Sequence, residues 1–375
     1  MNSLESATQS AGARLIERLA IMRRISQRSD WIERIIFSPA SEEAAYKLKG
    51  WMDASGMETF NDPLTNVYGQ KLFSKEGTEA PRIHIGSHYD TVVNAGAFDG
   101  ILGVLIGIAV VEAIVESKHP FNHNLSVLAF CDEEGVRFNT TFLGSAYLSG
   151  QFEEEWLHKE DEYGKTLGEW LVDRAESIDM IVNAYKTPYI RPQDVFLESH
   201  IEQGPILEKS NHALGVFTKI AAQLRSEIVL TGCAGHAGTI PASLRNDPLP
   251  VASEMILAVN QMCKSDELIR STVGRLEVIP NASNVIPGTV KFSIDMRYPD
   301  LKGLRRVHNE LSQKIKSIAK RSDLNFEYKL VHEASDAQLD QRLTDILAES
   351  CEVMQGSSPR MFSGAGHDSM KLAQV

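Results

Sequence analysis

The sequence predicts an α/β protein with a smaller α+β domain inserted into it, and three patterns support this fold class. First, an alternating strand at 82–87, an apolar helix at 100–117 and an apolar strand at 125–131 follow one another, as in a right-handed crossover unit. Second, from about Gly215 the order becomes β-α-β-β-α-β, the ferredoxin-like pattern. Third, near Ala334 the chain returns to a helix and then a short strand, so the α+β segment interrupts the larger domain.

The larger domain begins with helices between residues 10 and 56. Leu15, Leu19 and Met22 recur at helical spacing, and Ser41 is a candidate helix cap. A strand at 66–72 follows, and a later strand-like run covers 194–197.

The smaller domain contains four expected strands and two expected helices. The strands are 225–231, 272–279, 289–296 and 325–331, and the helices are 247–263 and 304–318. The predicted division of the chain is 1–213 for the first part of the larger domain, 214–332 for the inserted domain and 333–375 for the second part of the larger domain.

Composition excludes several classes of protein. The 375 residues carry a formal net charge of -12, which argues against a binder that follows nucleic-acid phosphates. The four cysteines are far apart without a CxxC pair, so a disulfide framework or a structural zinc knuckle is not expected. The polar N-terminus has no signal-peptide core, and the longest apolar run, 101–111, is too short to span a bilayer. We therefore expect a cytoplasmic protein.

The segment Gly86-Ser-His88-Tyr-Asp90 provides the strongest chemical signal, because it lies at the end of a predicted strand. His88 is placed to bind a metal through one imidazole nitrogen, and Asp90 could accept a hydrogen bond from the other. Asp99 follows at the start of the apolar helix, where a carboxylate can bridge two cations. By itself, the same pattern also fits an ordinary histidine in a polar loop.

A second signal is the acidic turn Cys131-Asp-Glu133-Glu134-Gly, which also follows an apolar strand. Adjacent carboxylates repel one another unless a cation or a proton lies between them. One carboxylate of the turn is then expected to be a metal ligand, and another a general base acting on a metal-bound water. A solvated acidic turn is the alternative interpretation.

Further candidates lie in other parts of the chain. His200 follows the strand-like run 194–197 and could supply another imidazole, while the amide of Gln203 suits a ureido group. The inserted domain offers the imidazole of His236, the carboxamide of Asn284 and the guanidinium of Arg297, a good partner for a substrate carboxylate. Each of these three also fits an ordinary turn or surface role.

Taken together, the motifs resemble the M20 metallopeptidase-like amidohydrolases, and more narrowly the hydantoinase/carbamoylase branch. This branch includes allantoate amidohydrolase, ureidoglycolate hydrolase, N-carbamoyl-L-amino-acid hydrolase and β-ureidopropionase. The resemblance covers nearly the whole chain and rests on six ordered segments: GSHYDTVVNAGAFDG, EEGVRFNTTFLGSA, HIEQGPILE, GHAGTIPASLRNDP, ASNVIPG and SGAGHD.

The resemblance implies a role for each matching position. Metal ligands are His88, Asp99, Glu134 and His200, with Asp99 bridging. The catalytic group comprises Glu133 as general base, Asp90 as the orienter of His88, and His236 as a stabiliser of the developing oxyanion. Substrate-binding residues are Gln203, Gln223, Asn284, Arg297 and His367.

The resemblance also implies a mixed-sheet metallohydrolase domain carrying a ferredoxin-like lid that mediates homodimerisation. His236 could then serve its own site or the partner's. The expected reaction is hydrolysis of a C–N bond in a small carbamoyl or ureido acid, which releases ammonia and carbon dioxide. The segment FSPAS, the run from Glu133 to Ala146 and Gln223 favour allantoate over an N-carbamoyl amino acid.

The implied cofactor is a pair of divalent cations, Mn²⁺, Zn²⁺ or Co²⁺. Members of the family usually continue through a Gly-Ile-Ser-His segment whose histidine completes the second metal site, whereas this sequence ends at Val375. His367 is a conceivable substitute ligand, although it resembles a pocket residue. If the protein naturally ends at this point, weak or single-metal occupancy and little activity are expected.

Two other interpretations remain open from the sequence. A cysteine-nucleophile amidase could use Cys131, although the nearest histidine in sequence, His123, is at the far end of the same strand. A non-catalytic binding protein that keeps the fold is the second alternative. A serine hydrolase is disfavoured, because no GxSxG segment is present.

Overall fold

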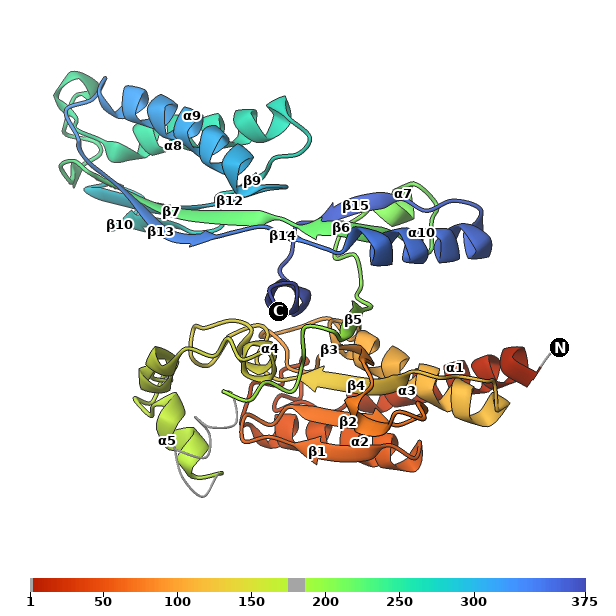
Figure 1. Cartoon of the computed structure of the whole chain (residues 1–375). Coiled ribbons are helices and arrows are strands. Elements are labelled where there is room, and N and C mark those ends of the chain that lie inside the picture. Colours follow the sequence, from red (N-terminus) through yellow and green to blue (C-terminus); the bar gives the residue numbers. More distant parts are fainter. Residues whose placement is uncertain (1–2, 175–185) are drawn as a thin grey trace. The chain divides into compact units, whose positions relative to one another are not determined.

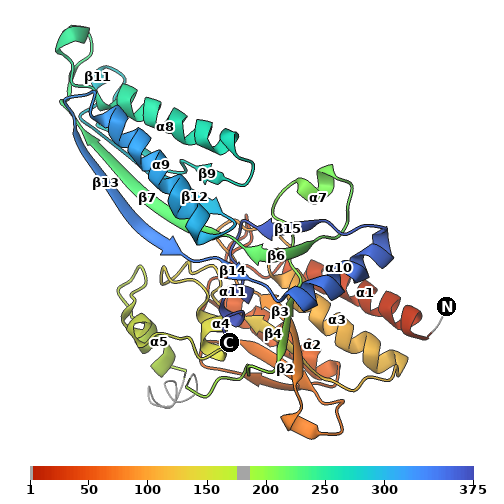
Figure 2. The ribbon, with the colours of Figure 1, turned by 45° about the horizontal axis from the view of Figure 1, so that its top comes forward.

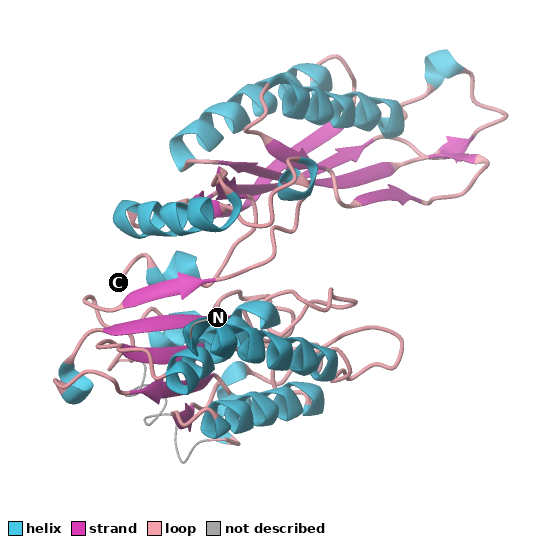
Figure 3. Ribbon diagram, turned by 90° about the vertical axis from the view of Figure 1, so that its right-hand side faces the viewer, coloured by secondary structure: helices cyan, strands magenta, loops and turns pink. Residues whose placement is uncertain are grey.

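The chain forms two compact units. The computed structural model describes residues 3–174 and 186–375 (Figure 1). One unit comprises Met1–Gln203 with His367–Val375, and the other comprises Gly204–Gly366. Helices pack against strands in both units (Figure 3). Within the described residues, no helix is both long and apolar enough to cross a membrane.

The first unit is built on a five-stranded mixed sheet in the order β1-β2-β4-β3-β5. Its strands are β1 (Glu58–Asn61), β2 (Val67–Lys71), β3 (Arg82–His88), β4 (Asn124–Phe130) and β5 (Val195–Glu198). Strand β3 lies parallel to both β4 and β5, whereas β2 is antiparallel to β1 and β4. The expected mixed α/β architecture is confirmed, and the carboxyl ends of three parallel strands meet at one edge.

The helices of the first unit supply most of its apolar core. They are α1 (Ser3–Met22), α2 (Pro39–Ala54), α3 (Ile101–Ser117), α4 (Leu143–Leu148), α5 (Leu167–Val172) and α11 (Ser369–Leu372), with 3-10 turns η1 (Gly77–Glu79) and η2 (Glu154–His158). Helix α3 is apolar almost all round, because it lies between the sheet and α1. Ser38 caps the N-terminus of helix α2, because its hydroxyl accepts a hydrogen bond from the Ser41 amide; the cap is therefore Ser38, not Ser41 as predicted.

The second unit contains a five-stranded antiparallel sheet, in which β10-β12-β7-β13 lie in that order and β9 also pairs with β12. Its elements are β7 (Ala222–Thr231), α8 (Pro248–Ser265), β9 (Arg270–Thr272), β10 (Leu276–Ile279), β12 (Thr289–Tyr298), α9 (Leu301–Ala319) and β13 (Asn325–Ala334). Helices α8 and α9 lie side by side on one face of the sheet (Figure 2). The strand predicted at 272–279 is in fact two short strands, β9 and β10, which both pair with β12.

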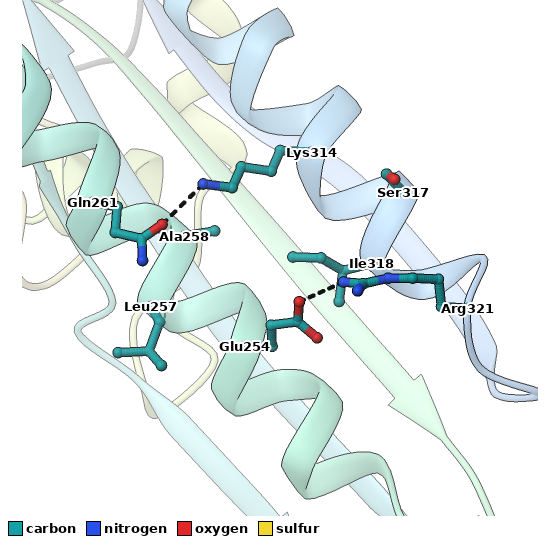
Figure 4. Close-up of a pocket in the computed structure, with 8 residues that line it drawn as sticks. All are labelled: Glu254, Leu257, Ala258, Gln261, Lys314, Ser317, Ile318 and Arg321. Atoms are coloured by element: carbon teal, nitrogen blue, oxygen red, sulfur yellow. Dashed lines mark hydrogen bonds and ion pairs between the residues drawn. The ribbon is translucent and has the colours of Figure 1, made fainter.

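The outward surface of α8 and α9 is closed by polar side chains from both helices. Lys314 donates a hydrogen bond to Gln261 over 3.0 Å, and Arg321 forms an ion pair with Glu254 (Figure 4). These contacts border a depression of about 330 Å³ between the helices. Exposed ion pairs of this kind contribute little stability, so the buried faces hold α8 and α9 on the sheet.

Smaller elements complete the second unit. They are α7 (Ile206–Lys209), β6 (Val216–Ile220), β8 (Gly235–His236), the 3-10 turn η3 (Ala242–Leu244), β11 (Val285–Ile286), β14 (Ala337–Gln338), α10 (Gln341–Gln355) and β15 (Arg360–Ser363). Strand β6 pairs with β14 and β15 in a three-stranded sheet, and β8 pairs with β11. Contacts thus group 333–366 with the second unit, and the predicted division into domains stays a prediction.

Candidate metal centre

Histidine and carboxylate side chains converge at the carboxyl edge of the first unit's sheet. His88 is the last residue of β3 and is 2% exposed. The acidic turn follows β4, and His200 follows β5 by two residues. Because β3, β4 and β5 run parallel, these three chain segments arrive at the same edge.

The first group of possible metal ligands comprises His88, Asp99 and His200. The two Nε2 atoms of the histidines are 3.5 Å apart, and an Asp99 carboxylate oxygen is 3.3 Å from Nε2 of His200. One donor atom from each residue lies within 4.8 Å of the others. Two imidazoles and one carboxylate facing a common point suit zinc, manganese or cobalt.

Close packing at Gly100 brings Asp99 to this group. A Cβ at Gly100 would lie 2.4 Å from ring atoms of His88, and the residue has a φ of +64°. A glycine is therefore needed both for the backbone conformation and for the contact with the imidazole. Gln203, predicted to bind substrate, donates hydrogen bonds of 3.1 and 3.2 Å to the two carboxylate oxygens of Asp99, which is one of the possible metal ligands.

The second group of possible ligands comprises His88, Glu133 and Glu134, again with donor atoms within 4.8 Å of one another. The carboxylate of Asp90 accepts hydrogen bonds from the backbone amides of Glu133 and Glu134 over 3.1 and 3.2 Å. Nδ1 of His88 lies 3.1 Å from the main-chain oxygen of Asp90 and 3.6 Å from its carboxylate. Asp90 therefore supports the acidic turn as well as the imidazole.

The electrostatics of this edge favour a bound cation. Burial raises the pKa of Glu133 well above its usual value and that of Glu134 to about 7. Burial opposes the charged form of His88, yet the neighbouring carboxylates of Asp90 and Glu133 raise its pKa well above the usual value. A divalent cation would stabilise the charged form of these buried carboxyl groups and offset the repulsion between them, so the residues present fit a metal centre.

His367 lies against the first ligand group. Its ring centroid is 4.5 Å from that of His200, and burial lowers its pKa to about 4. The imidazole is therefore neutral near pH 7 and available as a hydrogen-bond acceptor or a ligand. Its donor atoms are in neither of the ligand groups found among the described residues.

In the second unit, Gln223 and Arg297 meet on neighbouring strands, where they are paired in register. Both contact the carboxylate of Asp295, over 2.7 Å from the Gln223 amide and 3.0 Å from Arg297 Nε. Arg297 also donates to the main-chain oxygen of Gly364. Asp295 was given no role from the sequence, although its two-residue spacing from Arg297 places both on the same strand face.

His236 and Asn284 lie together at a separate two-stranded sheet, β8 with β11, beyond the opposite end of β7 and β12. His236 pairs with Val285 between β8 and β11, and the Ala237 amide donates to the Asn284 carbonyl. Both side chains are exposed. Gln223 and Thr231 are eight residues apart along β7, which is roughly 26 Å. Strand β11, which pairs with the β8 strand of His236, lies at the end of β7 away from Gln223 (Figure 2). One small substrate cannot reach both ends of this sheet.

The thiol of Cys131 is poorly placed for nucleophilic catalysis. It is fully buried in the apolar core, and its backbone amide donates to Asn66. Burial raises the pKa of the thiol well above its usual value, and the charge of Asp62 adds to this effect. The reactive thiolate is therefore disfavoured, which argues against the cysteine-nucleophile alternative.

The α/β fold and the possible metal ligands at its sheet edge are typical of a metal-dependent hydrolase. Comparison with known proteins identifies the family. The model of peptidase family M20/M25/M40 matches residues 84–375. The chain belongs to this family, and the resemblance predicted from the six sequence segments is confirmed.

Individual relatives narrow the similarity to amidohydrolases. The chain is 36% identical to an N-carbamoyl-L-amino-acid amidohydrolase of Pseudomonas sp. (strain NS671), covering 92% of this chain and 83% of the relative. It is 35% identical to allantoate deiminase 1 of Glycine max, covering 96% and 80%. A crystal structure of a hydantoinase/carbamoylase family amidase from Burkholderia multivorans matches with a TM-score of 0.86 and 32% identity, covering 97% and 87%. The functional class expected from the sequence agrees with these names.

Proposed function

We propose that this protein is a metal-dependent amidohydrolase that hydrolyses a C–N bond in a small carbamoyl or ureido acid, with allantoate as the preferred substrate. The observation that carries the proposal is the pair of possible ligand groups that share His88, the second of which contains Glu133 and Glu134. The names of the relatives support the same class of substrate. N-carbamoyl-L-amino acids and β-ureidopropionate are the alternative substrates.

Two divalent cations, Mn²⁺ or Zn²⁺ with Co²⁺ as a further candidate, are proposed as cofactors. His88, Asp99 and His200 would hold one, and Glu134 with a bridging Asp99 would hold the other. Bound cations would polarise the scissile carbonyl and lower the pKa of a water molecule. Asp90 would keep Glu134 in place through the hydrogen bond from its backbone amide, and Gln203 would do the same for Asp99.

Glu133 is the proposed general base. It takes a proton from the attacking water and passes it to the leaving nitrogen, which becomes ammonia. Burial raises its pKa well above that of an ordinary glutamate, which makes its carboxylate a stronger base. Hydrolysis of the carbamoyl group then yields ammonia, carbon dioxide and an acid that carries the freed amine.

Substrate recognition is assigned to the second unit and His367. Arg297, oriented by Asp295, would bind the substrate carboxylate together with Gln223 and Asn284. His236 would stabilise the oxyanion. We propose that 214–332 is a ferredoxin-like lid and dimerisation domain, and that 1–213 with 333–375 forms the catalytic domain.

The separation within the second unit supports a homodimer in which His236 acts across the interface. Gln223 and Arg297 lie at one end of β7 and β12, while His236 and Asn284 lie beyond the other end. A site that uses both groups therefore needs His236 and Asn284 from the partner subunit.

Mixing two inactive variants tests this arrangement. Randomly assorted subunits of His236→Ala and Glu133→Gln are expected to recover about a quarter of the parent activity, because half the dimers contain one intact site out of two. Absence of recovery, with subunit exchange verified by mass spectrometry, would place His236 in its own subunit's site.

Ammonia release tests the function itself. Metal-stripped protein is supplied with Mn²⁺ or Zn²⁺ and incubated with allantoate or with an N-carbamoyl-L-amino acid, beside a Glu133→Gln control. Metal-dependent release that the control abolishes supports the reaction, and the faster substrate identifies the specificity. Release from neither substrate, in protein that has bound metal, would overturn the proposal in favour of a binding role.

A further inference from the structure

Glu198 lies at the end of strand β5 and belongs to neither group of possible metal ligands. Its carboxylate nevertheless connects three chain segments that lie next to His88, His200 and His367. It is the last residue of β5 and lies opposite Gly86 of β3 in the parallel register. Its side chain is partly buried. Neither group of possible metal ligands includes it.

Both oxygens of the Glu198 carboxylate accept hydrogen bonds from outside its own strand. Ser87 of β3 donates its hydroxyl to Oε1 over 2.8 Å. Ser369 of α11 donates its backbone amide to Oε2 over 3.0 Å and its hydroxyl to the same oxygen over 2.6 Å. One carboxylate thus joins β3, β5 and α11 through three hydrogen bonds, each strengthened by its charge.

The residues joined by these three hydrogen bonds are close in sequence to the histidines of the candidate site. Ser87 immediately precedes His88, Glu198 precedes His200 by two residues, and Ser369 follows His367 by two residues. The rings of His88 and His200 have centroids 5.7 Å apart, and that of His367 is 4.5 Å from His200. Movement of any of the three segments would therefore separate these imidazoles.

We propose that Glu198 is a positioning residue that fixes β3, β5 and α11 relative to one another, so that His88, His200 and His367 face one metal centre. This role rests on the proposed function, because it concerns the same centre. Partners that orient metal ligands indirectly affect metal affinity as well as activity. A carboxylate suits the position because the amide of Ser369 can only donate, and Ser87 and Ser369 can donate at the same time.

The test compares Glu198→Ala with Glu112→Ala in the full chain. Glu112 is a matched control, because it is a buried glutamate of the same unit that joins separate segments through hydrogen bonds from Arg14, Arg18 and Ser55. Mn²⁺ affinity is measured by calorimetry on metal-stripped protein. The visible absorption of the Co²⁺-loaded protein reports the coordination geometry, and thermal unfolding without metal reports stability.

Glu198→Ala is expected to weaken Mn²⁺ binding by about 10-fold and to change the Co²⁺ spectrum. Glu112→Ala is expected to lower the melting temperature while keeping the parent affinity and spectrum. Glu198→Gln should lie nearer the parent, since its amide oxygen can accept from Ser369 and its NH₂ can donate to Ser87. Parent-like Mn²⁺ affinity and Co²⁺ spectrum in Glu198→Ala would overturn the positioning role.

Two milder variants keep the test decisive if Glu198→Ala does not fold. Ser87→Ala and Ser369→Ala each remove one hydroxyl donor and are expected to weaken Mn²⁺ binding in the same direction, and parent affinity in both would overturn the proposal. The same measurements distinguish failure of the proposed function from failure of the Glu198 proposal. A parent protein that binds neither Mn²⁺ nor Co²⁺ would overturn both proposals. Equal metal binding by the parent and the variants would overturn only the role of Glu198.

Discussion

The two units present their polar side chains in opposite ways. In the first unit, His88 is 2% exposed, Glu133 is 7% exposed, and both lie among other buried carboxyl groups. In the second unit, His236 and Asn284 are exposed, and they lie far along the sheet from Gln223 and Arg297. The possible ligands of the first unit lie close together within one chain, whereas the two polar groups of the second unit lie at separate places along the sheet.

The largest effect on activity is expected when Glu133, in the candidate metal centre of the first unit, is replaced. Glu133→Gln keeps the size of the side chain but removes the base, so ammonia release should fall by about 10³-fold. Metal content, measured by elemental analysis, should stay at the parent level, because Glu134 is the proposed ligand. A variant that kept more than a tenth of the parent rate would remove Glu133 from the role of base.

Metal binding in the first unit should depend strongly on the absence of a side chain at position 100. Gly100→Ala places a Cβ against the His88 ring, and we expect at least about 10-fold weaker Mn²⁺ binding by calorimetry. Gly77→Ala is the matched control, since its φ is +67° and nothing lies within 4 Å of the added Cβ. Equal losses in the two variants would mean that backbone strain, and not the contact with His88, causes the effect.

Substrate binding by the second unit can be tested at the strand end. Arg297→Ala should raise KM by about 30-fold, which corresponds to roughly 2 kcal/mol for a hydrogen-bonded charge, with a smaller change in kcat. Arg225→Ala is the control, because Arg225 contacts the same Asp295 over 3.1 Å but is largely exposed. A similar KM increase in both variants would assign the effect to Asp295 rather than to a substrate contact.

The smallest expected effect is a change in melting temperature of a few degrees with pH. Burial raises the folded-state pKa of Glu134 to about 7, and that of Glu133 is also raised, so the metal-free folded protein holds more protons than the unfolded chain. Its stability should therefore fall as pH rises from 6.5 to 8. His367, with its lowered pKa, acts in the opposite direction only below about pH 6.5, where the unfolded chain gains a proton.

Thermal unfolding at pH 6.5, 7.2 and 8 with a chelator, and again with Mn²⁺, measures this dependence. Saturating Mn²⁺ should raise the melting temperature most at the highest pH, because the ligands are then deprotonated. A chelated protein whose stability rises across this range would contradict the proposed acidic cluster.

Much of the fold follows from local patterns in the chain. The apolar runs that became β4 and α3, and the alternation that became β7 and β12, each predicted an element near its observed place. Strand β6 was not predicted, because its partners β14 and β15 come from residues more than a hundred positions later. The break between β9 and β10 was also missed, since both short strands share the apolar pattern of one longer strand.

The candidate site also has a part that the sequence predicts and a part that only the structure shows. Motifs at strand ends indicate His88, Glu133, Glu134 and His200, and the start of a helix indicates Asp99; the structure brings all five close together. Sequence motifs could not indicate that Gln203 would contact Asp99, that Asp295 would join Gln223 to Arg297, or that Glu198 would bind Ser87 and Ser369. Each of these contacts joins residues from separate elements.

By itself, the sequence determined the α/β class, the family and the types of chemical groups available, because periodicity and short motifs depend on neighbouring residues. Only the tertiary structure decided which groups share a site. Parallel pairing of β3, β4 and β5 collects the acidic and imidazole groups of the first unit, while the length of β7 keeps His236 away from Gln223. Such distances depend on strand order and register, which are set by packing over the whole unit.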